Sequence, residues 1–250
     1  MKILIVSQYF WPEYFRVNDL AKELSDQGHE LEVLTGYPNY PHGKIFKDFK
    51  NNRSAFDFFD NIKIYRVPIF ARGQNSSLFL VINYLSFLLS GIIIGSYKLR
   101  KKKYDLIITF ATSPIISALV SIFLSKIKNA KHFIWVLDLW PNVLHDLEII
   151  KNNNLIYKIF TRLVNYIYRN SDMIYCQSLS FKREIFKISP DSKEKLVFFP
   201  SWPEEVCENH LELKKNKFED FDKDYLNILF TGNIGEAQNF ELVVKIVDLT

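Results

Sequence analysis

The sequence predicts an α/β fold in which a parallel sheet is covered by helices on both faces. Short apolar segments alternate along the chain with longer segments whose apolar residues recur at helical spacing. That order is typical of parallel strands joined by helical crossovers. The short segments are apolar rather than alternating, as in residues 3–6, and strands buried on both faces require this pattern.

Each element has its own signal in the sequence. The expected strands cover residues 3–6, 31–35, 62–67, 106–110, 133–137, 173–177 and 196–199. The expected helices cover residues 19–25, 76–100, 115–127, 155–169 and 181–188. Asn18 is a residue type that caps helices, and Gly28 is a residue type that ends them, so these two bound the first helix.

A change of composition divides the chain into domains. Residues 1–206 hold the alternating pattern and form a first domain. Residues 207–225 are rich in Glu, Lys, Asn and Asp, which is typical of a solvated linker. Residues 226–230 then begin a new strand, and a helix follows from Gln238. One strand and one helix cannot form a core, so residues 226–250 are expected to be the incomplete start of a second domain.

Composition narrows the class of protein. The net charge is +4, and we find neither a nucleic-acid-binding motif nor a long basic stripe, so nucleic acid is not an expected partner. Cys176 and Cys207 lie in no metal-ligand or redox spacing. The N-terminus runs from Met-Lys directly into a short apolar strand without a cleavage site, so we expect a cytoplasmic protein.

The loop after the first strand argues against a dinucleotide site. Ligands of parallel sheets bind beyond the carboxyl ends of the strands. A dinucleotide fingerprint needs glycines there, and residues 7–13 contain none; a Walker loop is absent as well. Tyr9 and Trp11 offer flat apolar faces that suit sugar rings or a lipid. The alternative is that both side chains cover the edge of the sheet.

Two further loops carry candidate site residues. Residues 36–43 hold two tyrosines between prolines and glycines, and such a stiff loop can shape an acceptor pocket or serve as a plain connection. Asp138 follows an apolar strand, where a carboxylate can orient a hydroxyl or accept its proton; the alternative is a helix cap. Gly232 and Gly235 flank a strand-to-helix turn whose N–H groups can cradle an anion.

Taken together, these motifs resemble a known family. The segments are SQYFWPE at 7–13, GHE at 28–30, LTGYPNYP at 34–41, DLWP at 138–141, QS at 177–178 with FK at 181–182, and GNIGEAQ at 232–238. In this order they resemble the WbuB-like branch of glycosyltransferase family 4, which includes L-fucosamine transferases. The resemblance runs from residue 1 to residue 250. It implies the GT-B fold, in which two Rossmann-like domains face a cleft.

The resemblance also implies a function. Members of this family transfer a sugar from a nucleotide diphosphate donor with retention of configuration and without a required metal, so no cofactor is expected. Many act on lipid-linked or saccharide acceptors at the cytoplasmic face of the inner membrane, in surface polysaccharide assembly (O-antigen, capsule or exopolysaccharide). Two other functions stay open. One is a non-catalytic half that binds an acceptor and pairs with a separate second half, and the other is a sugar-nucleotide epimerase of the same fold.

Site residues follow from the same resemblance. Asp138 takes the position that faces the reacting sugar and is the candidate catalytic residue. The acceptor-side candidates are Tyr9, Trp11, Glu13, Tyr37, Asn39 and Tyr40. The donor-side candidates are Gly232, Asn233, Gly235 and Gln238. The sequence departs from the family at Leu137, where relatives often have Gln, and at Ser201, where they have Asn. The family's paired glutamates have no counterpart in the chain.

One long stretch suggests a membrane. Residues 73–97 contain no charged residue, and Lys98, Arg100 and residues 101–103 follow as a basic end. The stretch is long enough to span a bilayer, which needs about 20 apolar residues. It nevertheless contains Asn83 and lies between strands of one sheet. We therefore expect a helix packed on the sheet whose exposed apolar patch and basic end rest on anionic lipid; the alternative is a fully buried core helix.

Overall fold

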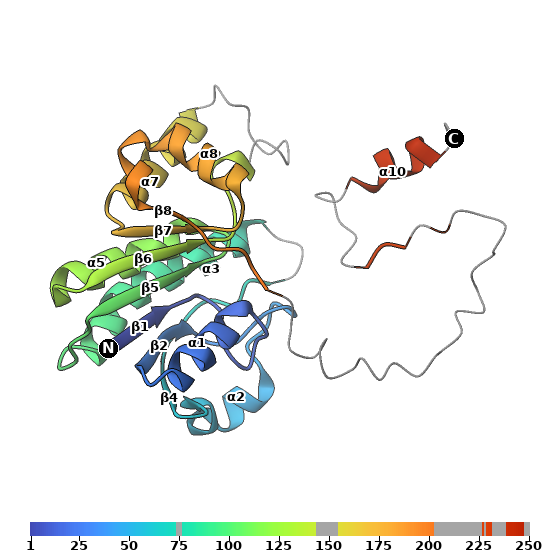
Figure 1. Cartoon of the computed structure of the whole chain (residues 1–250). Helices are drawn as coiled ribbons and strands as arrows, with labels where there is room; N and C mark the ends of the chain where they lie inside the picture. Colours follow the sequence, from blue (N-terminus) through green and yellow to red (C-terminus); the bar gives the residue numbers. More distant parts are fainter. Residues whose placement is uncertain (74–76, 144–154, 203–226, 228, 232–238, 248–250) are drawn as a thin grey trace.

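The computed structural model describes residues 1–73, 77–143, 155–202, 227, 229–231 and 239–247 (Figure 1). Its centre is an eight-stranded sheet in the order β3-β4-β2-β1-β5-β6-β7-β8. The strands are β1 (Lys2–Val6), β2 (Glu30–Gly36), β3 (Phe58–Phe59), β4 (Ile62–Val67), β5 (Leu106–Ala111), β6 (Lys131–Val136), β7 (Met173–Cys176) and β8 (Leu196–Phe198). All neighbours pair in parallel except β3 and β4. The predicted parallel sheet is confirmed, and the short antiparallel β3 was not predicted.

The strand order reverses at β1. The chain runs outward from β1 through β2 to β4 and then crosses to β5 on the other side of β1. At such a switch point the connections leave in opposite directions, and a crevice opens beyond the carboxyl ends of the strands. The loops that follow β1, β2, β5 and β6 are therefore the place to look for a ligand site.

Helices follow most of the strands. The α-helices are α1 (Arg16–Asp26), α2 (Lys47–Asn51), α3 (Ser77–Ser90), α4 (Ser96–Lys98), α5 (Ala118–Lys128), α7 (Leu155–Arg169), α8 (Leu179–Ile188) and α10 (Phe240–Val247). Four short turns have another geometry: η1 (Arg53–Phe56), η3 (Ile115–Ser117) and η4 (Pro190–Lys195) are 3₁₀, and η2 (Gly91–Gly95) is a π-helix. The single helix expected over 76–100 is thus α3, η2 and α4 in sequence.

Two sequence predictions were wrong. Asn18 does not cap α1, because the helix begins earlier and Phe15 occupies the cap position. The Asn18 side chain instead donates to the Glu13 carbonyl at 2.8 Å and accepts from the Trp11 amide at 3.3 Å. The strand expected over 226–230 is also not formed by the described residues Asn227, Leu229 and Phe230. A strand needs hydrogen-bonded neighbours, and none of the described strands pairs with these residues.

The two faces of the sheet are covered by different helices. Figure 1 shows α1 on one face and α3 and α5 on the other. On the first face, Ile3 and Ile5 of β1 pack with Val17 and Ala21 of α1. The opposite face is covered by α3, α5, α7 and α8, whose buried side chains include Phe87, Ile122, Val164 and Ile185. α1 and the long helix α3 therefore lie on opposite faces of the sheet, on either side of the loop that follows β1.

After β8 the chain returns over the α1 face of the sheet. Trp202 stacks on the buried Trp135 of β6, with ring centroids 5.2 Å apart and planes 18° apart. Phe199 meets the same indole edge-on at 5.2 Å. The first domain therefore reaches at least to residue 202. The predicted boundaries at 206 and 225 lie outside the described residues and stay a prediction.

Two glycines hold the long apolar helix close to the sheet. Gly91 and Gly95 are buried, and side chains at these positions would collide with their neighbours. A Cβ at Gly91 would lie 3.0 Å from both methyl groups of Val120, and one at Gly95 would lie 2.9 Å from Leu34. Glycine thus permits a close approach that no other residue allows at these positions without movement.

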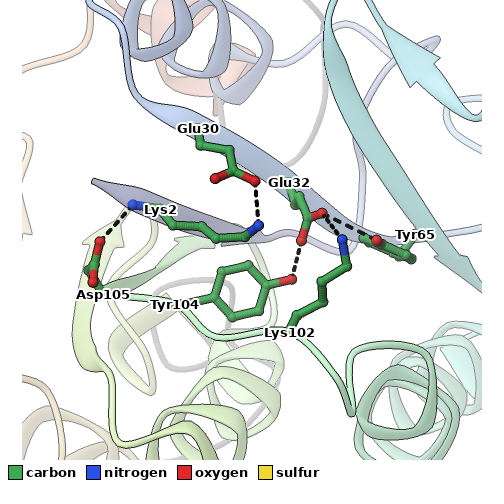
Figure 2. Close-up of polar contacts among 7 residues, drawn as sticks. All are labelled: Lys2, Glu30, Glu32, Tyr65, Lys102, Tyr104 and Asp105. Atoms are coloured by element: carbon green, nitrogen blue, oxygen red, sulfur yellow. Dashed lines mark hydrogen bonds and ion pairs between the residues drawn. The ribbon is translucent and has the colours of Figure 1, made fainter.

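A polar cluster joins β2 to the segment before β5 (Figure 2). The Glu32 carboxylate accepts from Lys102 Nζ at 2.8 Å, from the Tyr65 hydroxyl at 3.2 Å and from the Tyr104 hydroxyl. Burial alone would raise the pKa of Glu32, but the hydrogen bonds from Lys102 and Tyr104 outweigh it and lower that pKa. Lys102 therefore belongs to this cluster, and the contact of the basic end with lipid stays a prediction.

Candidate functional site

The loops after β1 and β2 meet at the carboxyl edge of the sheet through one buried carboxylate. Glu13 is 3% exposed. Its Oε1 accepts from the Asn39 and Tyr40 amides at 2.7 and 2.6 Å, and its Oε2 accepts from the Phe10 amide at 3.3 Å. Burial raises the pKa of Glu13 to about 7, against these backbone hydrogen bonds and the nearby charge of Arg66. Glu13 fixes the two loops relative to each other.

Arg66, the next-to-last residue of β4, also donates hydrogen bonds to backbone near the carboxyl edge of the sheet. It is 5% exposed and donates to the Gly36 carbonyl at 3.1 Å, the Phe56 carbonyl at 3.2 Å and the Trp11 carbonyl. Burial lowers the pKa of Arg66 to about 10, although Glu13 and Asp57 oppose that shift. The guanidinium thus gives its donors to backbone carbonyls and places Trp11.

The predicted acceptor-side residues divide into a buried and a partly exposed group. Tyr9 is buried, stacks on Phe15 at 5.4 Å and lies 5.6 Å from the Tyr40 ring. Glu13 and Asn39 are buried as well. Trp11, Tyr37 and Tyr40 are partly exposed. The structure therefore gives Tyr9 the edge-covering position that the sequence left open, and leaves part of each of the other three aromatic side chains exposed. Contact with an acceptor stays a prediction for all six.

Asp138 lies directly beyond β6 and is held from the neighbouring loop. Its Oδ2 accepts from Ser113 Oγ, beyond β5, at 2.7 Å, and Ser113 Oγ accepts from Trp140 Nε1 at 3.1 Å. The following helical residues begin at Asn142. Among the described residues no backbone N–H donates to the Asp138 carboxylate, so the helix-cap alternative has no support. The side chain is partly exposed and positioned by two fixed neighbours.

Sequence reasoning missed two residues beside this edge. Arg72, beyond β4, lies over the Tyr40 ring at 5.2 Å. Tyr84 of α3 lies within the electrostatic influence of both Arg72 and Asp138: burial raises its pKa, Arg72 opposes the shift and Asp138 adds to it. A polar Asn83-Tyr84 pair inside an apolar helix was a usable signal for Tyr84. Arg72 had no comparable signal, because its position depends on how two loops pack.

Asn83 links α3 to the loop after β1. It is fully buried, and its Oδ1 accepts from Gln8 Nε2 at 2.6 Å and from the Tyr9 hydroxyl at 3.3 Å. Its Nδ2 donates to the Phe70 carbonyl at 2.5 Å. Both polar atoms of this buried amide therefore have hydrogen-bond partners inside the protein. The predicted donor-side residues Gly232, Asn233, Gly235 and Gln238 lie outside the described residues.

Comparison with known proteins agrees with this architecture. No protein-family model matches the chain. The chain is 24% identical over 259 residues to "Putative colanic acid biosynthesis glycosyl transferase WcaI" of Escherichia coli (strain K12), covering 99% of this chain and 62% of that protein. It therefore spans less than two thirds of the length of this relative.

One solved structure shares the fold over most of the chain. A crystal structure of LpCGTa in complex with UDP matches with a TM-score of 0.52 at 9% identity, over 85% of this chain and 56% of that one. The fold is that of one half of the GT-B architecture. The apo form of the lipopolysaccharide outer core galactosyltransferase WaaB matches with a TM-score of 0.43 at 14% identity, over 80% of this chain and 46% of that one. In this GT-B half, the edge that carries Asp138, Trp11, Tyr37 and Tyr40 is the carboxyl edge of the sheet.

Proposed function

We propose that the chain is the acceptor-side part of a glycosyltransferase that moves a sugar from a nucleotide-sugar donor to a lipid-linked or saccharide acceptor in surface polysaccharide biosynthesis. One observation carries this proposal: the carboxyl edge of a GT-B half combines partly exposed aromatic rings with a positioned carboxylate, Asp138. Similarity over 99% of the chain to a protein named for colanic acid biosynthesis supports the polysaccharide context. The WbuB-like branch of family 4 is our finer proposal, on the motifs of the sequence.

The proposed roles follow from the positions of the side chains. Trp11, Tyr37 and Tyr40 offer ring faces against which an acceptor sugar packs. Asp138 orients the acceptor hydroxyl or accepts its proton while the donor's sugar–diphosphate bond breaks and the new glycosidic bond forms. Ser113 and Trp140 position Asp138 and do not themselves touch substrate. Donor phosphates are assigned to residues 232–238, and transfer is proposed to retain the anomeric configuration without a metal or other cofactor.

A transfer assay tests the proposal. The chain, joined to a complete donor-binding second domain, is incubated with UDP-, GDP- and dTDP-sugars and with lipid-linked saccharides extracted from membranes, and products are separated by chromatography. We expect one donor class to give a product with the donor's anomeric configuration, read by NMR. Release of a free epimerised nucleotide sugar would favour the epimerase. Product that forms only after a separately expressed second half is added would favour the non-catalytic acceptor-binding half.

We also propose peripheral contact with the cytoplasmic face of the inner membrane. Residues Leu78–Lys98 form a helix long and apolar enough to cross a membrane, with a mean hydropathy of 2.2. Only 22% of its most apolar window is buried, so the fully buried core helix that the sequence left open is not what the structure shows. The exposed apolar side chains recur every three or four residues and are 46% to 68% exposed: Leu78, Val81, Leu85, Leu89, Ile93 and Tyr97. Such spacing forms one apolar stripe along a helix.

The opposite side of this helix belongs to the protein core. Phe87 and Asn83 are fully buried, and Gly91 and Gly95 lie against Val120 and Leu34. A helix that crossed a bilayer would give up these contacts. We therefore propose that the helix stays on the sheet and lays its stripe in the membrane interface, with Arg100, Lys101 and Lys103 near anionic headgroups.

Vesicle flotation tests this contact. We expect the chain to bind phosphatidylglycerol vesicles, to be released by high salt, and to bind less after the double change Lys101→Glu and Lys103→Glu. Lys102 is left unchanged, since it pairs with the buried Glu32 at 2.8 Å. Retention through alkaline carbonate would show a spanning helix instead. Absence of binding at every salt concentration would exclude the proposed contact.

A further inference from the structure

Arg72 is fastened at the acceptor side by its backbone. Its N–H donates to Asn39 Oδ1 at 3.0 Å, and the next residue, Gly73, donates to the Gly43 carbonyl at 3.0 Å. Gly43 and Gly73 both have φ of +68°, and a Cβ at Gly43 would lie 2.0 Å from the Gly73 oxygen. Only glycine permits this contact. The segment that bears Arg72 is thereby joined to the loop that carries Tyr37 and Tyr40.

The Arg72 guanidinium is held without an anionic partner. It lies 5.2 Å from the centroid of the Tyr40 ring. Within the part of the chain that the structure describes, it makes no ion pair and donates no side-chain hydrogen bond. The other arginines of this region differ: Arg66 donates to backbone carbonyls, and Arg53 donates to the Tyr37 hydroxyl at 3.3 Å. Arg72 thus keeps a planar set of charge-assisted donors that matches phosphate oxygens.

Exposed apolar side chains lie close to Arg72 in the sequence. Phe70, two residues before Arg72, is 67% exposed, and Leu78 at the start of the α3 stripe is 66% exposed. Phe79 lies against Gly73, because a Cβ on Gly73 would meet Phe79 Cβ at 3.3 Å. A forked cation and an apolar stripe complement the two parts of a phosphorylated lipid, which are an anionic group and a hydrocarbon chain.

We propose that Arg72 binds the phosphate or diphosphate group that joins sugar to lipid in the acceptor, with the first part of the hydrocarbon chain along Phe70, Leu78 and Phe79. This inference rests on the proposed glycosyltransferase function and specifies its acceptor as a lipid phosphate. A nucleotide-sugar donor also carries a diphosphate. The adjoining apolar side chains favour the acceptor, because a nucleoside has no hydrocarbon chain to place on them.

Binding of a soluble prenyl diphosphate tests the proposal. The chain is titrated with farnesyl diphosphate, farnesol, inorganic pyrophosphate and UDP at one fixed salt concentration. We expect farnesyl diphosphate to bind at least about tenfold more tightly than each of the others, since only it offers both groups. Equal binding of farnesol would show that the phosphate is not recognised. Equal binding of UDP would assign the cation to the donor, and equal binding of pyrophosphate would remove the lipid from the proposal; each result would overturn it.

A matched pair of variants locates the effect. Arg72→Gln should weaken farnesyl diphosphate binding about tenfold or more, the usual loss of a charge-assisted contact. Arg72→Lys should recover part of it, because it keeps the charge without the fork. Arg53→Gln removes another arginine that lies over a tyrosine of the same loop, at 5.1 Å from Tyr37, and should change binding less than about twofold, as expected for a residue outside the contact. Equal losses in both arginine variants, or none in Arg72→Gln, would overturn the assignment.

The outcome is separable from that of the transfer assay. If sugar transfer proceeds on a phosphate-free saccharide and Arg72→Gln is fully active, the inference about Arg72 fails and the proposed function stands. If Arg72-dependent binding of farnesyl diphosphate is found without any sugar transfer, the inference about Arg72 stands and the proposed function fails. The double variant of Lys101 and Lys103 should keep its farnesyl diphosphate binding while losing vesicle binding, which separates the site from general attraction to anionic lipid.

Discussion

Among the described residues, Asp138 receives one hydrogen bond, from Ser113 Oγ at 2.7 Å, and it lies directly beyond the strand β6. In the transfer assay we expect Asp138→Asn to lower turnover about a hundredfold or more, as happens when a positioned acid–base or orienting group is lost. The amide keeps an oxygen that can accept from Ser113, so the fold should persist. Asp105→Asn, at the opposite edge of the sheet where Asp105 accepts from the Lys2 amide at 2.7 Å, is the control and should retain full turnover.

Glu13 gives the protein a predicted pH signature. Its folded-state pKa of about 7 exceeds the ordinary 4.5. Between these two values the folded protein binds a proton that the unfolded chain does not, so the stabilising contribution is complete below pH 4.5 and is lost as pH rises through 7. The whole effect is at most on the order of 3 kcal/mol.

Glu13→Gln removes this titration while its amide oxygen can still accept from the Asn39 and Tyr40 amides. Urea unfolding of both proteins at pH 5 and pH 8 measures the difference: we expect the variant's free energy of unfolding to change less over this interval than that of the wild type. The lowered pKa of Glu32 acts in the opposite direction, with stability lost as pH falls, and it is common to both proteins. Parallel pH profiles would contradict the assignment to Glu13.

Single residues show where sequence reasoning about the site succeeded and stopped. Tyr9, Tyr40 and Asp138 each follow a predicted strand. Because the predicted strands are parallel, their carboxyl ends lie at one edge of the sheet, and this places the three residues there. Burial could not be predicted, because it depends on contacts such as the two amides that meet Glu13 across 26 and 27 residues of chain. Arg72 could not be predicted for the same reason, because its position depends on the contact between Gly43 and Gly73, which lie 30 residues apart in the sequence.

At the scale of elements, the long apolar helix depends on close packing at Gly91. Gly91→Val should lower the free energy of unfolding by about 2 kcal/mol, since added methyl groups would overlap Val120, although valine forms helices better than glycine. Ile93→Val creates the same residue at a 68% exposed site and should stay within about 0.5 kcal/mol. Urea unfolding followed by circular dichroism measures both. Equal stability of the two variants would show that the helix does not depend on this contact.

Elements with a clear apolar period were predictable, and those set by tertiary contacts were not. The strands β1, β2 and β4 and the helices α7 and α8 lie close to their predicted residues, because burial on a sheet requires those patterns. The π-helical turn at Gly91–Gly95 was missed, since a π-turn has no composition of its own. The start of α1 was misjudged because Asn18 satisfies loop groups, a partner choice that sequence does not record.

For the whole molecule, the last described helix, α10, exposes most of its apolar side chains. Leu242, Val243, Val244 and Ile246 of α10 are 42% to 58% exposed. An anion cradle at residues 232–238 would need packed support to bind with affinity. We therefore expect the 250-residue chain to bind nucleotide sugars weakly or not at all, by titration calorimetry with UDP- and GDP-sugars. Micromolar binding would contradict this expectation and place a complete donor site within these residues.

The stack of Trp202 on Trp135 lets tryptophan fluorescence report on the segment that follows the last strand of the first domain. Among the 4 tryptophans of the chain, Trp202 is the last described residue before residues 203–226. An indole that leaves a stack for water shifts its fluorescence emission to longer wavelength. With Trp11 and Trp140 replaced by phenylalanine, the emission of the remaining pair reports whether the segment after β8 leaves the sheet before the rest of the domain unfolds in urea, without any attached dye.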